Sequence, residues 1–144
     1  MCIRDSALPY RVRVKICGIT SAADAEAAVD AGADALGFNS WKGSRRYLDL
    51  PKAAEWLREV PCFVSRVALG INLPVEEALC VSELPYIDLL QLHGEEPADY
   101  CARIAAAGRS FVRAVRLTGA DSLAGLRGWS TRHVLLDASV PGAF

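Results

Sequence analysis

The sequence predicts an α/β fold in which parallel strands alternate with helices. Six short apolar runs begin near residues 12, 34, 63, 87, 111 and 133, one about every 22 to 29 residues. Amphipathic or alanine-rich stretches of helical length lie between them. Strict strand–helix alternation is typical of parallel strands joined by right-handed crossovers. Two architectures satisfy this pattern, an open doubly wound sheet and a (β/α)8 barrel.

Length and composition indicate one domain with a substantial core. The chain has 144 residues, of which 52% are apolar, and a mean hydropathy of +0.20. A net charge of −1 gives no electrostatic reason to expect nucleic acid or an acidic membrane surface as a partner. No apolar run reaches the roughly 18 to 20 residues that span a bilayer. Nothing in the sequence indicates an oligomeric state.

Cysteine usage indicates a reducing compartment. The five cysteines are widely spaced and include no Cys-x-x-Cys pair. This pattern argues against a disulfide framework or a metal cluster, so we expect a cytoplasmic protein without a metal site. Residues 1–9 lack the basic start and apolar core of a secretory signal and match nothing that follows. We expect them to be a non-native or disordered leader, with the domain over 10–144.

The first predicted strand, over residues 12–17, organises the chain. Its side chains alternate, so Lys15 and Cys17 share one face and Ile16 lies on the other. Gly18 then allows the backbone to turn toward an alanine-rich helix. Cys17 therefore lies at the carboxyl end of a strand that leads into a helix, where α/β folds place their chemistry. The alternative is a buried structural cysteine.

The other elements follow in order. Helices are expected where serine or proline opens a stretch or glycine closes one, over 21–31, 51–59, 74–84, 97–107 and 121–129. Strands are expected over 33–38, 63–71, 87–94, 111–117 and 133–137. The polar, basic and aromatic loop 39–47 follows a strand, as Gly18 does. No Gly-x-Gly-x-x-Gly follows the first strand, which disfavours the dinucleotide-binding form of the doubly wound sheet.

Five motifs in the same order and at the same intervals resemble phosphoribosylanthranilate isomerase. They are KICGIT at 15–20, GADALGF at 32–38, SRRY at 44–47, QLHGE at 91–95 and LLD at 135–137. The resemblance covers about residues 12–140. It implies a (β/α)8 barrel enzyme of tryptophan biosynthesis. This family converts N-(5-phosphoribosyl)anthranilate to 1-(2-carboxyphenylamino)-1-deoxyribulose 5-phosphate by an Amadori rearrangement, without a cofactor.

The length of the chain predicts an incomplete barrel. The sequence ends shortly after the sixth predicted strand, whereas a (β/α)8 barrel has eight units and usually more than about 200 residues. We therefore expect about six βα units, strands 1 to 6. In such barrels the loops after strands seven and eight commonly bind phosphate. The 144-residue chain alone is expected to be essentially inactive.

The resemblance also implies the catalytic pair. An Amadori rearrangement needs an acid that protonates the ribose ring oxygen and a base that removes the C2′ proton, so two groups in different protonation states are required. By resemblance, Cys17 is the base and Asp137 the acid. A free thiol has a pKa of about 8.5, so the base role requires positive neighbours or helix-terminus dipoles. The alternative for Asp137 is a strand-end carboxylate that caps the next turn.

Three further residues are implied to bind the substrate. Arg46 resembles the family arginine that holds the anthranilate carboxylate, for which a guanidinium fork is suited. Gln91 and His93 share a strand face and by resemblance point into the barrel mouth. The alternative for His93 is a histidine of the core or rim whose nitrogens are hydrogen-bonded within the protein. Two rival functions remain open. One is a sister barrel acting on another phosphorylated intermediate, and the other is an inactive scaffold fragment with two bare sheet edges.

Overall fold

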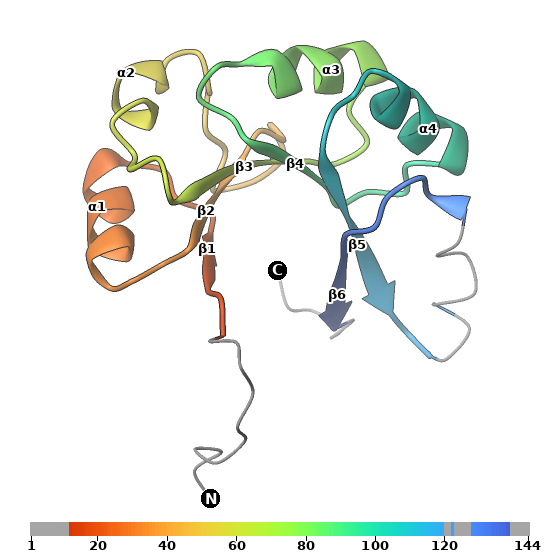
Figure 1. Ribbon diagram of the computed structural model, residues 1–144, viewed down its shortest axis with the longest axis horizontal. Helices are drawn as coiled ribbons and strands as arrows, with labels where there is room; N and C mark the ends of the chain where they lie inside the picture. The colour runs from red at the N-terminus through yellow and green to blue at the C-terminus, as the bar shows by residue number, and fades with distance from the viewer. Residues whose placement is uncertain (1–11, 120–121, 123–127, 139–144) are drawn as a thin grey trace, which may run out of the picture.

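The computed structural model describes residues 12–119, 122 and 128–138, which form one curled sheet with helices along its outer side (Figure 1). The strands are β1 (Lys15–Cys17), β2 (Ala35–Asn39), β3 (Ser65–Gly70), β4 (Leu89–Leu92), β5 (Phe111–Leu117) and β6 (Val134–Ala138). All neighbouring pairs are parallel, and the order in the sheet is β1-β2-β3-β4-β5-β6. A doubly wound sheet reverses its strand order at a switch point, whereas a barrel does not. Of the two predicted architectures, the structure therefore has the incomplete barrel.

Four helices connect the first five strands and cover the convex face of the sheet (Figure 1). They are α1 (Ala22–Asp30), α2 (Ala54–Leu57), α3 (Val75–Glu83) and α4 (Ala98–Ala106). The main core lies between sheet and helices and includes the fully buried Phe38, Leu57 and Leu90. Phe38 meets Trp56 edge to face, with ring centroids 5.8 Å apart. The predicted leader and most of the predicted helix 121–129 lie outside the described residues.

Local chemistry explains where the predicted boundaries hold and where they are wrong. Helix α1 begins after Ser21, whose hydroxyl accepts the Asp24 N–H at 3.1 Å, as an N-cap does. The predicted helix 51–59 shrinks to Ala54–Leu57 because residues 51–53 form turns. The predicted strand 63–71 begins only at residue 65. The N–H of Val64 donates to the carbonyl of Pro61 at 2.9 Å, so a turn occupies 61–64 and Phe63 is 97% exposed.

Aspartates at the amino ends of two strands join neighbouring strands. Asp34, just before β2, accepts the N–H of Val14 at 2.8 Å. Asp88, just before β4, accepts the backbone N–H of Arg66 at 2.7 Å and pairs with its guanidinium at 2.8 Å. The Arg66 guanidinium lowers the pKa of the Asp88 carboxyl. A structural hydrogen bond and an ion pair thus occupy the amino ends of these strands, while the predicted site residues belong to the carboxyl ends.

The two edge strands expose apolar side chains. In the described part of the chain, β1 and β6 each pair with one neighbour, β2 and β5. Ile16 on β1 is 40% exposed and Leu136 on β6 is 56% exposed. Because successive side chains of a strand point to opposite faces, Ile16 and Leu136 lie on the face opposite Cys17 and Asp137. The bare edges expected from an incomplete barrel are present in the described residues.

Candidate active site

Strand β2 places Cys17 on the concave face of the sheet. Leu36 and Phe38 belong to the helix-facing core, so Gly37 between them faces the other way. A Cβ on Gly37 would lie 2.8 Å from Cys17 Sγ and 2.9 Å from Lys15 Nζ. The thiol and the ammonium group are therefore neighbours on the concave face, as the alternation of residues 12–17 predicts. Gly37 supplies the space in which they meet.

Cys17 is an exposed thiol, so the alternative of a buried structural cysteine is wrong. The ammonium group of Lys15 is a positive neighbour of this thiol. Cys101 shows the contrasting case. It is fully buried in the core, and burial raises the pKa of its thiol. Of these two cysteines, only Cys17 is exposed.

The loop after β2 brings Arg46 to Cys17. The N–H of Arg46 donates to Ser44 Oγ at 3.0 Å, which fixes the loop locally. Arg46 Nη1 donates to the carbonyl of Cys17 at 3.1 Å. Gly18 has φ +87°, and a Cβ there would lie 2.6 Å from the Arg46 guanidinium. The guanidinium therefore lies directly over the turn that follows Cys17. One contact occupies only part of its five-donor fork, which leaves this exposed group able to meet a carboxylate.

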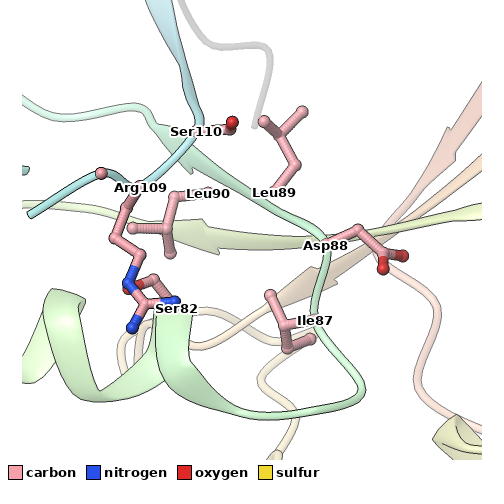
Figure 2. A pocket seen from close by; sticks show the side chains of 8 residues that line it. Ser82, Ile87, Asp88, Leu89, Leu90, Arg109 and Ser110 are labelled. Atoms are coloured by element: carbon pink, nitrogen blue, oxygen red, sulfur yellow. The ribbon is translucent and has the colours of Figure 1, made fainter. Parts of the chain in front are cut away.

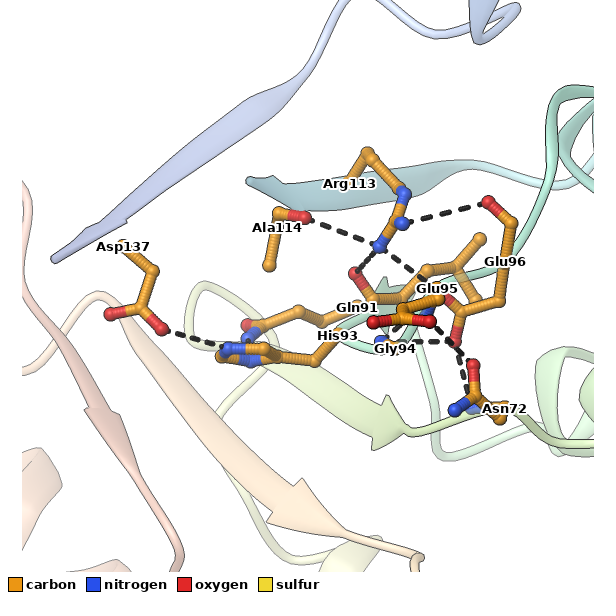
Figure 3. Close-up of polar contacts among 10 residues, drawn as sticks. Asn72, Gln91, His93, Gly94, Glu95, Glu96, Arg113, Ala114 and Asp137 are labelled. Atoms are coloured by element: carbon orange, nitrogen blue, oxygen red, sulfur yellow. Dashed lines mark hydrogen bonds and ion pairs between the residues drawn. The ribbon is translucent and has the colours of Figure 1, made fainter. Parts of the chain in front are cut away.

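Gln91, His93 and Asp137 form a chain of polar contacts between β4 and β6 (Figure 3). Gln91 Nε2 lies 3.0 Å from His93 Nδ1, and His93 Nε2 lies 3.0 Å from Asp137 Oδ2. Gln91 is only 2% exposed, whereas the side chains of His93 and Asp137 are 26% and 41% exposed. The chain therefore runs from a buried amide to an accessible carboxyl group at the carboxyl ends of the strands.

The orientation of the Gln91 amide gives these polar contacts two hydrogen-bonding states. With Nε2 toward His93, Nδ1 accepts, so the neutral imidazole carries its proton on Nε2 and donates to an Asp137 carboxylate. In that state Gln91 Oε1 is buried without a partner among the described residues. If the amide is turned over, Oε1 accepts from Nδ1–H. In a neutral imidazole Nε2 then accepts, which pairs it with a protonated Asp137. The same heavy-atom positions thus accommodate either form of Asp137.

The structure brings the five predicted site residues together as two groups. Arg46 lies against Cys17, and Gln91 and His93 lead to Asp137. Both groups lie at the carboxyl ends of strands, on the face opposite the helices. The alternative in which Asp137 caps the next turn concerns residues 139–144, which lie outside the described residues. The roles of the five residues stay predictions.

Sequence reasoning missed two buried charged residues at this edge, Glu96 and Arg113. They are 4% and 5% exposed and form an ion pair with Oε2 and Nη1 2.9 Å apart. A signal was available, because an arginine inside the apolar strand over 111–117 requires a partner. The identity of that partner depends on the fold. The importance of Gly37, which lies inside the apolar run 33–38, likewise appears only when β1 and β2 are paired.

A cavity of about 200 Å³ lies at the other end of the strands (Figure 2). It is lined by residues around the amino ends of β4 and β5, including Ser82, Asp88 and Arg109. None of the predicted site residues lines it. The part of the chain described by the structure also contains no cluster of three His, Cys, Asp or Glu side chains able to hold a metal ion. No helix among these residues is long and apolar enough to cross a membrane.

Comparison with known sequences identifies relatives over almost the whole chain. A family model described as N-(5'phosphoribosyl)anthranilate (PRA) isomerase matches residues 14–143. The N-(5'-phosphoribosyl)anthranilate isomerase of Geotalea daltonii is 42% identical over 132 residues, which are 92% of this chain and 62% of the relative. That of Bordetella pertussis is 47% identical over 118 residues, 81% of this chain and 53% of the relative. The chain spans about three fifths of the length of the Geotalea relative.

Solved structures agree in fold. The phosphoribosyl anthranilate isomerase of Thermotoga maritima superposes with a TM-score of 0.84 at 36% identity, covering 92% of this chain and 64% of that one. A phosphoribosyl anthranilate isomerase in complex with reduced 1-(o-carboxyphenylamino)-1-deoxyribulose 5-phosphate gives 0.81 at 36% identity, covering 89% and 66%. The resemblance carried by the five motifs is confirmed, and the chain belongs to the N-(5'-phosphoribosyl)anthranilate isomerase family.

Proposed function

We propose that this chain supplies the base, the acid and the anthranilate-binding arginine of an enzyme that isomerises N-(5'-phosphoribosyl)anthranilate. The product would be 1-(2-carboxyphenylamino)-1-deoxyribulose 5-phosphate, in the Amadori step of tryptophan biosynthesis. One observation carries the proposal: a family match over residues 14–143 coincides with a thiol and a carboxyl group at the carboxyl ends of β1 and β6. The related structure that contains the reduced form of this product supports the substrate class.

In the first step Asp137 acts as the acid. It gives its proton to the ribose ring oxygen, the bond from C1′ to that oxygen breaks, and the nitrogen lone pair forms the Schiff base. The state of these contacts in which His93 Nε2 carries no proton is the one in which Asp137 is protonated. The 3.0 Å contact between these atoms supports this role. Asp137 is left as a carboxylate, which the other state of the His93 chain accommodates.

In the second step Cys17 acts as the base. Its thiolate removes the C2′ proton, and the electrons of that C–H bond form the C1′–C2′ double bond while the nitrogen regains its lone pair. The resulting enol tautomerises to the ketone. The exposed position of Cys17 on the concave face, with the ammonium group of Lys15 as a neighbour, supports this role. The rearrangement moves hydrogen within one molecule, so its electron balance requires no cofactor.

Arg46 would hold the anthranilate carboxylate close to Cys17. Its guanidinium lies over Gly18 and is exposed, so a bidentate pair with a carboxylate is geometrically open. The substrate would be a phosphorylated small molecule. The phosphate would be held by loops after two further strands of a complete barrel, since those loops commonly bind phosphate in this fold. The thiols Cys17, Cys62, Cys80 and Cys101 are free, which supports a reducing cytoplasmic location.

A test of this function needs the complete barrel. The chain is joined to the part of the Geotalea daltonii relative that follows the matched segment, and loss of N-(5'-phosphoribosyl)anthranilate fluorescence is recorded. We expect turnover by the joined protein and essentially none by the 144-residue chain alone. Turnover of a different sugar phosphate, with none of this substrate, would favour the sister barrel. A joined protein that folds but turns over none of these sugar phosphates would favour the inactive scaffold fragment.

A further inference from the structure

A buried ion pair lies next to the loop that follows His93 and has no role in the steps above. Glu96 Oε2 and Arg113 Nη1 are 2.9 Å apart, with side chains only 1% and 6% exposed. Removing two charges from water is costly, and apolar residues of similar volume often give equal or greater stability. A buried ion pair is therefore weak evidence that these two residues serve to stabilise the folded state. Its surroundings indicate what else it does.

The Glu96 carboxylate holds the backbone that follows His93 (Figure 3). Oε1 accepts the N–H of Asn72 at 2.9 Å, and both oxygens accept the N–H of Gly94 at 3.1 Å. The Asn72 side chain in turn accepts the N–H of Glu95 at 2.7 Å. Gly94 lies so close to Asn72 that any side chain there would collide with it. One carboxylate thus joins the loops after β3 and β4 and fixes the residue next to His93.

The Arg113 guanidinium extends the same network toward β6. Nη1 donates to the carbonyls of Leu92 and Ala114, each at 3.2 Å. The guanidinium also lies over the ring of Trp129, 5.0 Å from its centroid. Trp129 stands a few residues before β6, the strand that carries Asp137. Arg113 therefore connects the end of β4 with the segment that leads to Asp137.

We propose that Glu96 and Arg113 are positioning residues that hold His93 Nε2 on Asp137 Oδ2 and thereby select the form of the acid. This inference rests on the proposed function for its kinetic consequences. The two ends of the His93–Asp137 contact lie on different strands, β4 and β6, with β5 between them. The pair fixes both ends from the helix-facing side, where it leaves the concave face free for substrate. Neither residue touches the reacting atoms.

The kinetic test uses the joined protein of the preceding section. Glu96→Gln keeps the shape of the side chain and removes its charge, so we expect kcat to fall about tenfold or more with KM within about twofold. The matched control is Glu76→Gln, which breaks the exposed pair of Glu76 with Arg103 at 2.7 Å, away from the site, and should leave both constants unchanged. In an Asp137→Asn background, Glu96→Gln should cause little further loss of kcat, because the pair acts through Asp137.

A second readout needs no turnover. The imidazole nitrogen signals of His93, identified by their loss in His93→Gln, are followed by NMR through a pH titration. Glu96→Gln should shift the titration of His93 and change its tautomer balance, while Glu76→Gln should not. If Glu96→Gln fails to fold, Arg113→Lys is used instead. This change keeps the positive charge and removes the planar guanidinium group. A folded variant with unchanged His93 titration and unchanged kcat overturns the inference.

The two readouts separate this inference from the proposed function. If the joined protein does not turn over the substrate, the proposed function fails, while the His93 titration still reports whether Glu96 controls the His93–Asp137 contact. If turnover is normal and the titration does not respond to Glu96→Gln or Arg113→Lys, only the positioning role fails. A loss of kcat that matches a loss of folded protein in every variant also overturns it.

Discussion

His93 Nε2 lies 3.0 Å from Asp137 Oδ2, although the two residues are 44 positions apart in the chain. His93 follows β4 and Asp137 lies on β6, so the contact crosses the carboxyl edge of the intervening β5. Its other ring nitrogen lies 3.0 Å from the buried amide of Gln91. An imidazole with partners at both nitrogens has a defined tautomer for each form of the carboxyl group. The proposed acid therefore has a partner that matches it before and after proton transfer.

Gly37→Ala should impair the proposed base without touching the substrate. The new methyl carbon would lie 2.8 Å from Cys17 Sγ and 2.9 Å from Lys15 Nζ, so at least one of them must move. We expect kcat to fall about tenfold or more, because small displacements of a catalytic group are costly. The control is Gly119→Ala, where an added Cβ has nothing within 4 Å. Equal kcat for the two variants would show that the space at Gly37 is not needed.

Arg46→Lys tests the carboxylate-binding role. Lysine keeps the positive charge and loses the planar fork, so a bidentate pair with the anthranilate carboxylate becomes a point contact. We expect KM to rise about tenfold, a loss typical of one charge-assisted hydrogen bond. Arg45→Lys is the matched neighbour and should change KM less than about twofold. Steady-state kinetics of both variants on the joined protein decide between them, and a larger effect at Arg45 would contradict the assignment.

The Arg66–Asp88 pair should make stability depend on acid pH. The pKa of Asp88 is lowered by the Arg66 guanidinium, so the pair stabilises the fold above the unfolded value of about 3.9 and loses this effect as the pH falls through the lower folded value. Because Asp88 is 42% exposed, we expect Asp88→Asn to cost only about 1 kcal/mol at pH 7. Denaturant titrations at pH 7 and pH 2.5 measure the difference.

At the lower pH the two proteins should unfold at nearly the same denaturant concentration. Glu76→Gln provides a comparison. The ion pair of Glu76 with Arg103 is exposed and screened by solvent, so its loss should matter less at either pH. A constant difference between wild type and Asp88→Asn across this range would show that the neutral hydrogen bonds of residue 88, and not its charge, support the strand.

Much of the fold followed from elementary patterns, and its departures have local causes. Alternation of apolar runs and helical stretches predicted every described strand, yet it left barrel and doubly wound sheet open, because strand order is a long-range property. The turn over 61–64 displaced the start of β3. Phe63 looked like a strand residue by its side chain alone, and the Val64–Pro61 hydrogen bond decides otherwise.

The candidate site was predictable only in part. Motifs supplied Cys17, Arg46 and Asp137, and period-two spacing put Gln91 and His93 on one face. Which of them meet is not readable from spacing: the Arg46–Cys17 contact requires the loop after β2 to fold back over Gly18. The Glu96–Arg113 pair joins a loop to a strand across the helix-facing layer. A charged residue in an apolar strand signals that such a partner exists without naming it.

The central claim is that Cys17 and Asp137 carry the proton transfers. The most direct measurement is the loss of N-(5'-phosphoribosyl)anthranilate fluorescence by the joined protein and its variants Cys17→Ala, Asp137→Asn and Cys62→Ala. Cys62 is also an exposed free thiol and serves as the control. We predict that each of the first two variants lowers kcat by about 100-fold or more, the usual scale of acid–base catalysis, and that Cys62→Ala matches wild type. Full turnover by folded Cys17→Ala or Asp137→Asn would contradict the account.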